Sequence, residues 1–319
     1  MKHQTVVILD FGSQYSQLIA RRVRDLNVHS VILSCTVNLK KITAHQPIGI
    51  ILSGGPDSVY ADNAPRFNRE VFDLGVPILG ICYGLQSVIH SLGGRVAKGE
   101  GGGEYGSTRI RVDDRSPIMA GIEGTLEVWM SHGDRVESLP RGFVGIAESA
   151  SCPWAAVEGI DGRFFGLQFH PEVTHTKKGE VMLRNFLYGI CHATGDWEMT
   201  SFIDDAVTSI RARAAGEKVV LGLSGGVDSS VTALLIHKAI GDRLECILVD
   251  NCFMRMNEVE QVRNTFRDHF NIKLHTVDAS DRFLAAIQGI SDPEEKRKRI
   301  GNTFVEIFKE AAQRSEEHT

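Results

Sequence analysis

The chain has 319 residues, of which 42% are hydrophobic and 24% are charged, and its formal net charge is −5. This length favours two domains with separate cores, and the composition is ordinary for a globular protein. The negative charge excludes a global basic field for nucleic acid, and no apolar run reaches the ~20 residues that span a bilayer. The six cysteines show no C-x-x-C spacing, which argues against a zinc site or a disulfide framework. We therefore expect a cytoplasmic protein without nucleic-acid or membrane partners.

The first half alternates strand and helix patterns. Strands are predicted at residues 6–10, 29–33, 48–52 and 76–79, and helices at residues 15–26 and 68–74. This alternation predicts a parallel, doubly wound sheet with its active site at the carboxyl ends of the strands. Further along, half-exposed strands are expected at 109–112, 126–130 and 144–147, after a flexible loop at 101–106.

Cys82 lies where a predicted strand turns sharply into a helix. Residues 80–84 read Gly-Ile-Cys-Tyr-Gly, and the helix is expected to start at Leu85. A nucleophile flanked by glycines at such a turn is the nucleophile-elbow pattern, here with cysteine in place of serine. A helix N-terminus favours the thiolate, which is the reactive form. The same residues also suit a buried cysteine that packs as a small hydrophobe, and Cys82 alone does not decide between the two.

Two further groups could complete a catalytic site with Cys82. In an extended segment, residues two apart point to the same side, so His170 could act as a base while Glu172 orients its ring. Gly54 and Gly55 end the predicted strand at 48–52 and could direct backbone N–H groups at an oxyanion. Taken alone, each group is more commonly an ordinary turn. Together they predict a triad in the chain order Cys, His, Glu.

Three sequence blocks resemble the signature blocks of class I glutamine amidotransferases, in the order in which that family has them. The blocks are residues 53–56 (Ser-Gly-Gly-Pro), 80–86 (Gly-Ile-Cys-Tyr-Gly-Leu-Gln) and 168–172 (Gln-Phe-His-Pro-Glu), within a resemblance over residues 5–192. The resemblance implies a flavodoxin-like α/β domain with a mixed sheet. It also implies that Cys82 attacks the glutamine carboxamide, that His170 moves the protons and that Glu172 holds His170.

The same resemblance implies how the substrate is held. The backbone N–H groups of Gly55 and Tyr83 would form the oxyanion hole. The side chain of Gln86, with backbone groups around Ser131 and His132, would hold the glutamine. The residues assigned in this way to the oxyanion hole and to glutamine binding are Gly54, Gly55, Tyr83, Gln86, Ser131 and His132.

The second half begins after a candidate linker at residues 193–199, which predicts domains at 1–196 and 197–319. A helix is expected up to residue 215 and a strand at 218–223, followed by the loop 224–230 and a helix from Val231. A glycine-rich loop between a strand and a helix N-terminus is typical of a phosphate cradle, in which Asp228 could hold Mg²⁺. The alternative is a Ser/Gly turn that only caps the helix.

The loop 224–230 resembles the PP-loop of N-type ATP pyrophosphatases, which activate a carbonyl group as its adenylate. Blocks at 249–251, 278–283 and 292–304 resemble, in that order, glutamine-hydrolysing GMP synthetases. This resemblance implies an incomplete Rossmann-like domain that uses ATP and Mg²⁺, with XMP as the acceptor and a homodimer for the full-length family member. It assigns ATP binding to Ser224, Gly225, Gly226, Val227, Asp228, Ser229, Ser230, Val249 and Asp250.

The second half also departs from that family in two places. Cys252 stands where the family has glycine, and we expect it to crowd the nucleotide pocket. Members of the family continue well past residue 319, through the rest of the ATP domain and a dimerisation domain that binds XMP. Residues 313–319 do not resemble the family and are expected to form a frayed or foreign tail. We therefore expect the chain to be a C-terminally truncated GMP synthetase.

The leading hypothesis is the reaction of XMP, ATP, glutamine and water to GMP, AMP, pyrophosphate and glutamate. In it, ammonia released at Cys82 displaces AMP from the adenylated xanthine carbonyl. For the chain as given, two other hypotheses are a glutaminase without synthetase activity and a non-catalytic nucleotide-binding fragment. A glutamine-dependent synthase acting on another purine or on a tRNA carbonyl is a further alternative.

Overall fold

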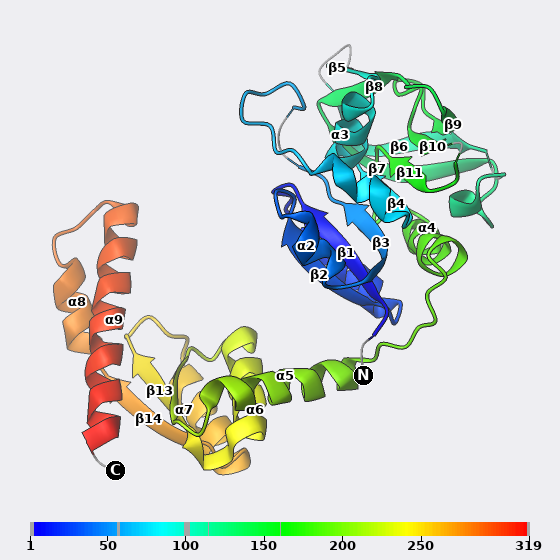
Figure 1. Cartoon of the computed structure of the whole chain (residues 1–319). Helices are drawn as coiled ribbons and strands as arrows, with labels where there is room; N and C mark the ends of the chain where they lie inside the picture. The colour runs from blue at the N-terminus through cyan, green and yellow to red at the C-terminus, as the bar shows by residue number, and fades with distance from the viewer. Residues whose placement is uncertain (1–2, 56–57, 99–102, 114, 160, 318–319) are drawn as a thin grey trace. The chain divides into compact units, whose positions relative to one another are not determined.

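The computed structural model describes residues 3–55, 58–98, 103–113, 115–159 and 161–317. The chain divides into two compact units, Met1–Glu198 and Met199–Thr319, which Figure 1 follows from the N-terminus to the C-terminus. Among the residues described, no helix combines the length and the apolar character that crossing a bilayer requires.

A nine-stranded mixed sheet forms the centre of the first unit, in the order β2-β1-β3-β4-β11-β10-β9-β6-β7. The parallel strands are β1 (Thr5–Asp10), β2 (His29–Ser34), β3 (Pro47–Leu52), β4 (Ile78–Ile81) and β11 (Phe164–Leu167). The antiparallel strands are β6 (Glu104–Val112), β7 (Thr125–His132), β9 (Phe143–Glu148) and β10 (Ala156–Gly159). A separate ribbon pairs β5 (Arg95–Lys98) with β8 (Asp134–Ser138). The expected flavodoxin-like domain with a mixed sheet is confirmed.

Helices cover both faces of the parallel part of this sheet. They are α1 (Ser16–Asp25), α2 (Leu39–Thr43), η1 (Arg69–Leu74), α3 (Tyr83–Ser91), η2 (Pro117–Met119), α4 (Gly179–Arg184) and η3 (Asn185–Ile190). On β1, Val6 and Ile8 share a core with α1 and α4, whereas Val7 and Leu9 share one with α2, η1 and α3. Both faces of the strand are buried, which explains why its sequence is a continuous apolar run.

The prediction of a flexible loop at 101–106 is wrong for the second half of that segment. Residues 104–106 begin β6, and Glu104 lies opposite His132 of β7. Pairing along β7 supplies these residues with backbone hydrogen bonds, which overrides the weak strand preference of the glycine-rich sequence. Residues 101–102 lie outside the described residues.

The second unit is a smaller α/β layer. Its parallel strands lie in the order β12 (Val219–Leu223), β13 (Leu244–Asp250) and β14 (Lys273–Asp278). Its helices are α5 (Met199–Ala214), α6 (Val227–Ile240), η4 (Gly241–Arg243), α7 (Glu258–Arg263), η5 (Asn264–His269), α8 (Ser280–Ile287) and α9 (Pro293–Glu317). On β13, Cys246 and Leu248 pack with α5 and α6, whereas Ile247 and Val249 pack with α8 and α9.

Two boundaries in this unit differ from the prediction. Helix α6 begins at Val227 rather than Val231, because the hydroxyls of Ser229 and Ser230 bond to the carbonyl of Gly226 and close its first turn. Helix α9 continues through Glu317, so residues 313–317 of the expected frayed tail extend a helix that is anchored by buried Ile307. His318 and Thr319 lie outside the described residues.

Candidate active site

Cys82 occupies a sharp turn between β4 and α3. Its φ of 51° lies in the left-handed region, which is uncommon for a residue other than glycine and is often found at functional sites. Its N–H donates to the carbonyl of Leu167 on the neighbouring parallel strand at 2.7 Å. A Cβ on Gly84 would lie too close to the carbonyl oxygen of Leu52, so glycine lets α3 pack directly against β3. These contacts give the turn one defined geometry.

His170 and Glu172 form a buried pair beside this turn. The ring Nδ1 of His170 lies 2.7 Å from Oε1 of Glu172, and the two residues are only 4% and 1% exposed. The N–H of His170 donates to the carbonyl of Trp129 in β7 at 3.1 Å, and Thr176 Oγ1 donates to the carbonyl of His170 at 2.6 Å. The segment that follows β11 is therefore held against β7, a strand at the far end of the sheet order.

The environment of His170 favours its charged form. Burial alone lowers its pKa, but hydrogen bonds to Cys82 and Glu172 and the charges of these two groups outweigh burial and raise the pKa to about 10. An imidazolium beside a cysteine is the arrangement that stabilises a thiolate. Gly54 leaves room for this ring, because a Cβ there would lie 3.2 Å from Cε1 of His170.

A cavity of about 330 Å³ opens in front of Cys82. It is lined by Gly55, Ser58, Cys82, Tyr83, Gln86, Tyr105, Ser131, His132, Gly133 and Asp134. Of the residues expected for this site, only Gly54, His170 and Glu172 are outside this lining, and Gly54 and Glu172 both adjoin His170. The structure therefore brings all nine expected residues together. Pro56, the last residue of the block at 53–56, lies outside the described residues.

The hydrogen bonds of Gln86 limit what it could offer a substrate. Its Nε2 donates to the carbonyl of Asp134 at 2.6 Å and to Oε1 of Gln168 at 3.3 Å. A side-chain amide has two N–H hydrogens, so both are used within the protein. Gln86 therefore has its Oε1, an acceptor, to offer toward the cavity.

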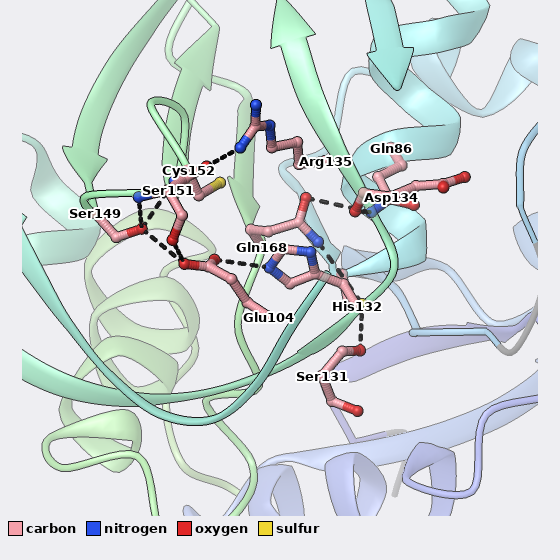
Figure 2. A network of polar contacts seen from close by, with 11 residues as sticks. Gln86, Glu104, Ser131, His132, Asp134, Arg135, Ser149, Ser151, Cys152 and Gln168 are labelled. Atoms are coloured by element: carbon pink, nitrogen blue, oxygen red, sulfur yellow. Dashed lines mark hydrogen bonds and ion pairs between the residues drawn. The ribbon is translucent and has the colours of Figure 1, made fainter. Parts of the chain in front are cut away.

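A second polar cluster, which the sequence analysis missed, holds His132 (Figure 2). Nε2 of His132 lies 3.1 Å from Oε2 of Glu104, whose Oε1 accepts hydrogen bonds from Ser149 and Ser151. Burial lowers the pKa of His132, against the opposing charge of Glu104, and burial raises the pKa of Cys152 to about 12.

One donor atom each from Glu104, His132 and Cys152 lies within 4.8 Å of the others, a grouping that could hold a metal ion. Hydrogen bonds already satisfy Glu104, so this cluster needs no ion to hold its carboxylate in place. The spacing of these residues carries no C-x-x-C signal, and Glu104 fell in the predicted loop, which is why sequence analysis missed them.

In the second unit, serine side chains shape the loop 224–230. The backbone N–H of Ser224 donates to Oγ of Ser229 at 3.2 Å, and that of Gly226 donates to Oγ of Ser224 at 3.3 Å. Gly225 has a φ of 77°, which glycine adopts without strain. The exposed Asp228 lies in the first turn of α6, at the end of the helix where anions bind.

The other expected ATP residues lie at the same edge of the small sheet. Because β12 and β13 are parallel, Asp250 at the end of β13 lies at the sheet edge where the loop 224–230 follows β12. Asp250 and Cys252 line a cavity of about 450 Å³. Val249 is buried in the core with α8 and α9, so only its backbone could meet a ligand. Cys252 has a φ of 61°, the conformation that favours the glycine expected there.

The fold and the Cys82 site define the class of this protein. Residues 7–190, more than half of the chain, match the family model described as glutamine amidotransferase class-I, and the chain belongs to that family. Residues 197–306 match a second model, described as NAD synthase.

Several curated relatives are named GMP synthase [glutamine-hydrolyzing]. The chain is 50% identical to the one from Heliobacterium modesticaldum over 310 residues, and 49% identical to the one from Shewanella piezotolerans over 317 residues. Each alignment covers 97% of this chain but 60% of the relative, so the chain spans about three fifths of the length of these proteins.

Solved structures resemble the first part of the chain. A candidate GMP synthase subunit from Thermoplasma acidophilum has a TM-score of 0.51 and 30% identity, over 60% of this chain and 96% of that one. A glutamine amidotransferase from Thermotoga maritima has a TM-score of 0.50 and 20% identity, over 60% of this chain and all of the other, and it supports the fold alone.

Proposed function

We propose that the first unit hydrolyses glutamine to glutamate and ammonia with Cys82 as nucleophile, His170 as acid and base, and Glu172 as the group that orients His170. The observation that carries this proposal is the buried 2.7 Å bond between His170 and Glu172 beside Cys82. The membership of the chain in the glutamine amidotransferase family supports it further.

The reaction needs two proton transfers, both through His170. The thiolate of Cys82 attacks the carboxamide carbon, and backbone N–H groups of Gly55 and Tyr83 stabilise the oxyanion. The imidazolium of His170 protonates the leaving nitrogen, which departs as ammonia and leaves a glutamyl thioester. Neutral His170 then takes a proton from water, and the resulting hydroxide cleaves the thioester. This step restores the Cys82 thiolate beside the His170 imidazolium and gives the acid form of glutamate, which loses its proton to solvent.

Binding of glutamine would use the rest of the cavity lining. The Oε1 of Gln86 is suited to accept from an N–H or an ammonium group of the substrate, because its Nε2 is already bonded to Asp134 and Gln168. Backbone groups at Ser131 and His132 line the same cavity and would complete the binding of glutamine.

We further propose that the ammonia serves an ATP-dependent amination of XMP to GMP, in which the second unit binds ATP at the loop 224–230. The names of the relatives at about 50% identity support this acceptor. Asp228 suits Mg²⁺, because this ion is commonly held by one or two carboxylates together with substrate phosphates. When bound, Mg²⁺ would neutralise phosphate charge. A cytoplasmic location and a homodimer for the full-length protein belong to the same proposal.

Ammonia release from glutamine tests the first step. Cys82→Ala should abolish it, whereas Cys191→Ala, which removes a buried thiol of the same unit away from the site, should retain it. Ammonia release that persists in Cys82→Ala would refute the proposed nucleophile.

Product analysis tests the second step. The full-length gene product should convert XMP to GMP while forming AMP, and no such conversion would refute XMP as the acceptor.

With the chain as given, release of ammonia without formation of AMP would identify a glutaminase. No turnover, with protection of the loop 224–230 from proteolysis by ATP, would identify a nucleotide-binding fragment. Amination of another purine or a tRNA carbonyl would identify a different synthase.

A further inference from the structure

Gln168 contacts the sulfur of Cys82, although no role has yet been given to it. It is fully buried and follows β11 directly, two residues before His170. Its Nε2 donates to Sγ of Cys82 at 3.8 Å, and its Oε1 accepts from Nε2 of Gln86 at 3.3 Å. Figure 2 shows the amide of Gln168 beside the side chain of Gln86.

The neighbouring groups decide which end of the Gln168 amide faces the sulfur. A main-chain carbonyl can only accept, so the 2.6 Å contact with the carbonyl of Asp134 identifies the near atom of Gln86 as its nitrogen. That same nitrogen faces Gln168, which must therefore present its oxygen to Gln86. The N–H of Gln168 is left to point at Cys82.

Two groups at the sulfur favour opposite protonation states. The thiol of Cys82 lies 3.7 Å from the carbonyl oxygen of Ser131, an acceptor that suits S–H but repels a thiolate. The N–H of Gln168 is a donor that binds a thiolate more strongly than a neutral thiol, because hydrogen bonds to charged groups are about twice as strong as neutral ones. Transfer of the proton to His170 therefore strengthens the contact with Gln168.

We propose that Gln168 is a further catalytic residue, whose side-chain N–H stabilises and orients the Cys82 thiolate during attack on glutamine. This inference rests on the proposed function, since it concerns the same nucleophile. The chain of contacts from Asp134 through Gln86 to Gln168 ensures that a donor, and not the amide oxygen, meets the sulfur. In this proposal Gln86 has two roles, since it orients the amide of Gln168 and also lines the cavity.

The test is the pH dependence of Cys82 alkylation by iodoacetamide, followed by mass spectrometry of the Cys82 peptide. Gln168→Met keeps the length and burial of the side chain but has no donor. The alkylation midpoint is the pH at which Cys82 reacts at half of its maximal rate. We expect this midpoint to rise by about one pH unit in Gln168→Met, because the thiolate, a charged group, loses one hydrogen bond. At pH 7.5, kcat for ammonia release should fall about tenfold, with KM for glutamine changed less than about twofold.

Asn185→Leu is the matched control, because the Asn185 amide donates to the carbonyls of Ile118 and Ala120 in the same unit, away from the sulfur. Asn185→Leu should keep the wild-type alkylation midpoint of Cys82, even if it changes the stability of the first unit. If Gln168→Met does not fold, Gln168→Asn retains the amide and withdraws it from the sulfur, and it should also raise the midpoint.

A wild-type midpoint in a folded Gln168 variant would overturn the inference, even if glutamine hydrolysis is established. In a different outcome, the wild-type protein releases no ammonia from glutamine, but Gln168→Met still raises the alkylation midpoint of Cys82. That result would support the contact between Gln168 and the thiolate and would refute the proposed function.

Discussion

In the first unit the proposed reacting groups are buried within the protein, whereas in the second unit the proposed phosphate-binding loop faces solvent. Cys82, His170 and Glu172 are each at most 4% exposed, whereas Val227 in the loop is 77% exposed. Burial strengthens the interactions between charges, so the Cys82 site can stabilise an ion pair with its own side chains. The loop has N–H groups, hydroxyls and one carboxylate. Its strong electrostatic interactions would be made with the charges of a bound nucleotide and not within the protein. The two sites should therefore respond to different changes.

Glu172→Gln should have the largest effect, because it removes one of the two neighbouring charges, those of Glu172 and Cys82, that raise the pKa of His170 inside the protein. By analogy with other triads, we expect glutamine hydrolysis to fall by about 10³-fold or more. Alkylation of Cys82 at pH 7.5 should slow as well. ATP protection of the loop 224–230 should be unchanged, and a parallel loss there would contradict the separation of the two sites.

The same pair predicts a pH dependence of stability. Folding raises the pKa of His170 from its ordinary value of 6.5 to about 10, so its protonation stabilises the fold fully below about pH 6.5. This contribution should decline as the pH rises toward 10. All three tryptophans lie in the first unit, so their fluorescence during denaturant unfolding reports on it. Glu172→Gln should show a shallower decline, and an equal slope would argue against this pair as the cause.

Gly84→Ala should destabilise the first unit by about 2 kcal/mol, because its Cβ would overlap the main chain of Leu52. Tryptophan fluorescence during unfolding measures the change. Gly189→Ala is the control, since a Cβ at that helical position meets nothing within 4 Å. Equal stability of the two variants would mean that α3 can move away from β3 without cost.

Asp228→Asn should weaken binding of ATP in the presence of Mg²⁺ by about tenfold, since a carboxylate is a better ligand for Mg²⁺ than an amide. Calorimetric titration with and without Mg²⁺ measures this, and the two proteins should differ less without the ion. Cys82 alkylation should not change. An equal loss with and without Mg²⁺ would assign Asp228 a contact to the nucleotide itself.

Cys252→Gly should have the smallest effect. It relieves a left-handed conformation that costs other residues roughly 1–2 kcal/mol, and the flexibility of glycine in the unfolded chain offsets part of that gain. We expect less than about 1 kcal/mol of added stability in the second unit, measured by hydrogen exchange of β13 amides. Modestly tighter ATP binding would support the expected crowding by Cys252, and weaker binding would contradict it.

Local sequence patterns determined the two units' fold class, the elbow at Cys82, the His170–Glu172 pair and the loop 224–230. Each of these features depends on local signals, namely the spacing of apolar residues, the positions of glycines and the residues that start helices. Alternation also located parts of β6, β7 and β9. It did not give their order in the sheet, because a pattern within one strand does not say which strand pairs with it.

Tertiary structure alone decided the contacts around the sulfur. Gln168 meets Cys82 across 86 positions of sequence, Gln86 meets Asp134 across 48, and Glu104 meets His132 across 28. No periodicity relates residues so far apart. Their meeting follows from the parallel pairing of β4 with β11 and from the segment after β11, which returns the chain to β7. The sequence therefore predicted the nucleophile, and only the packing of distant strands placed Gln168 and Gln86 beside it.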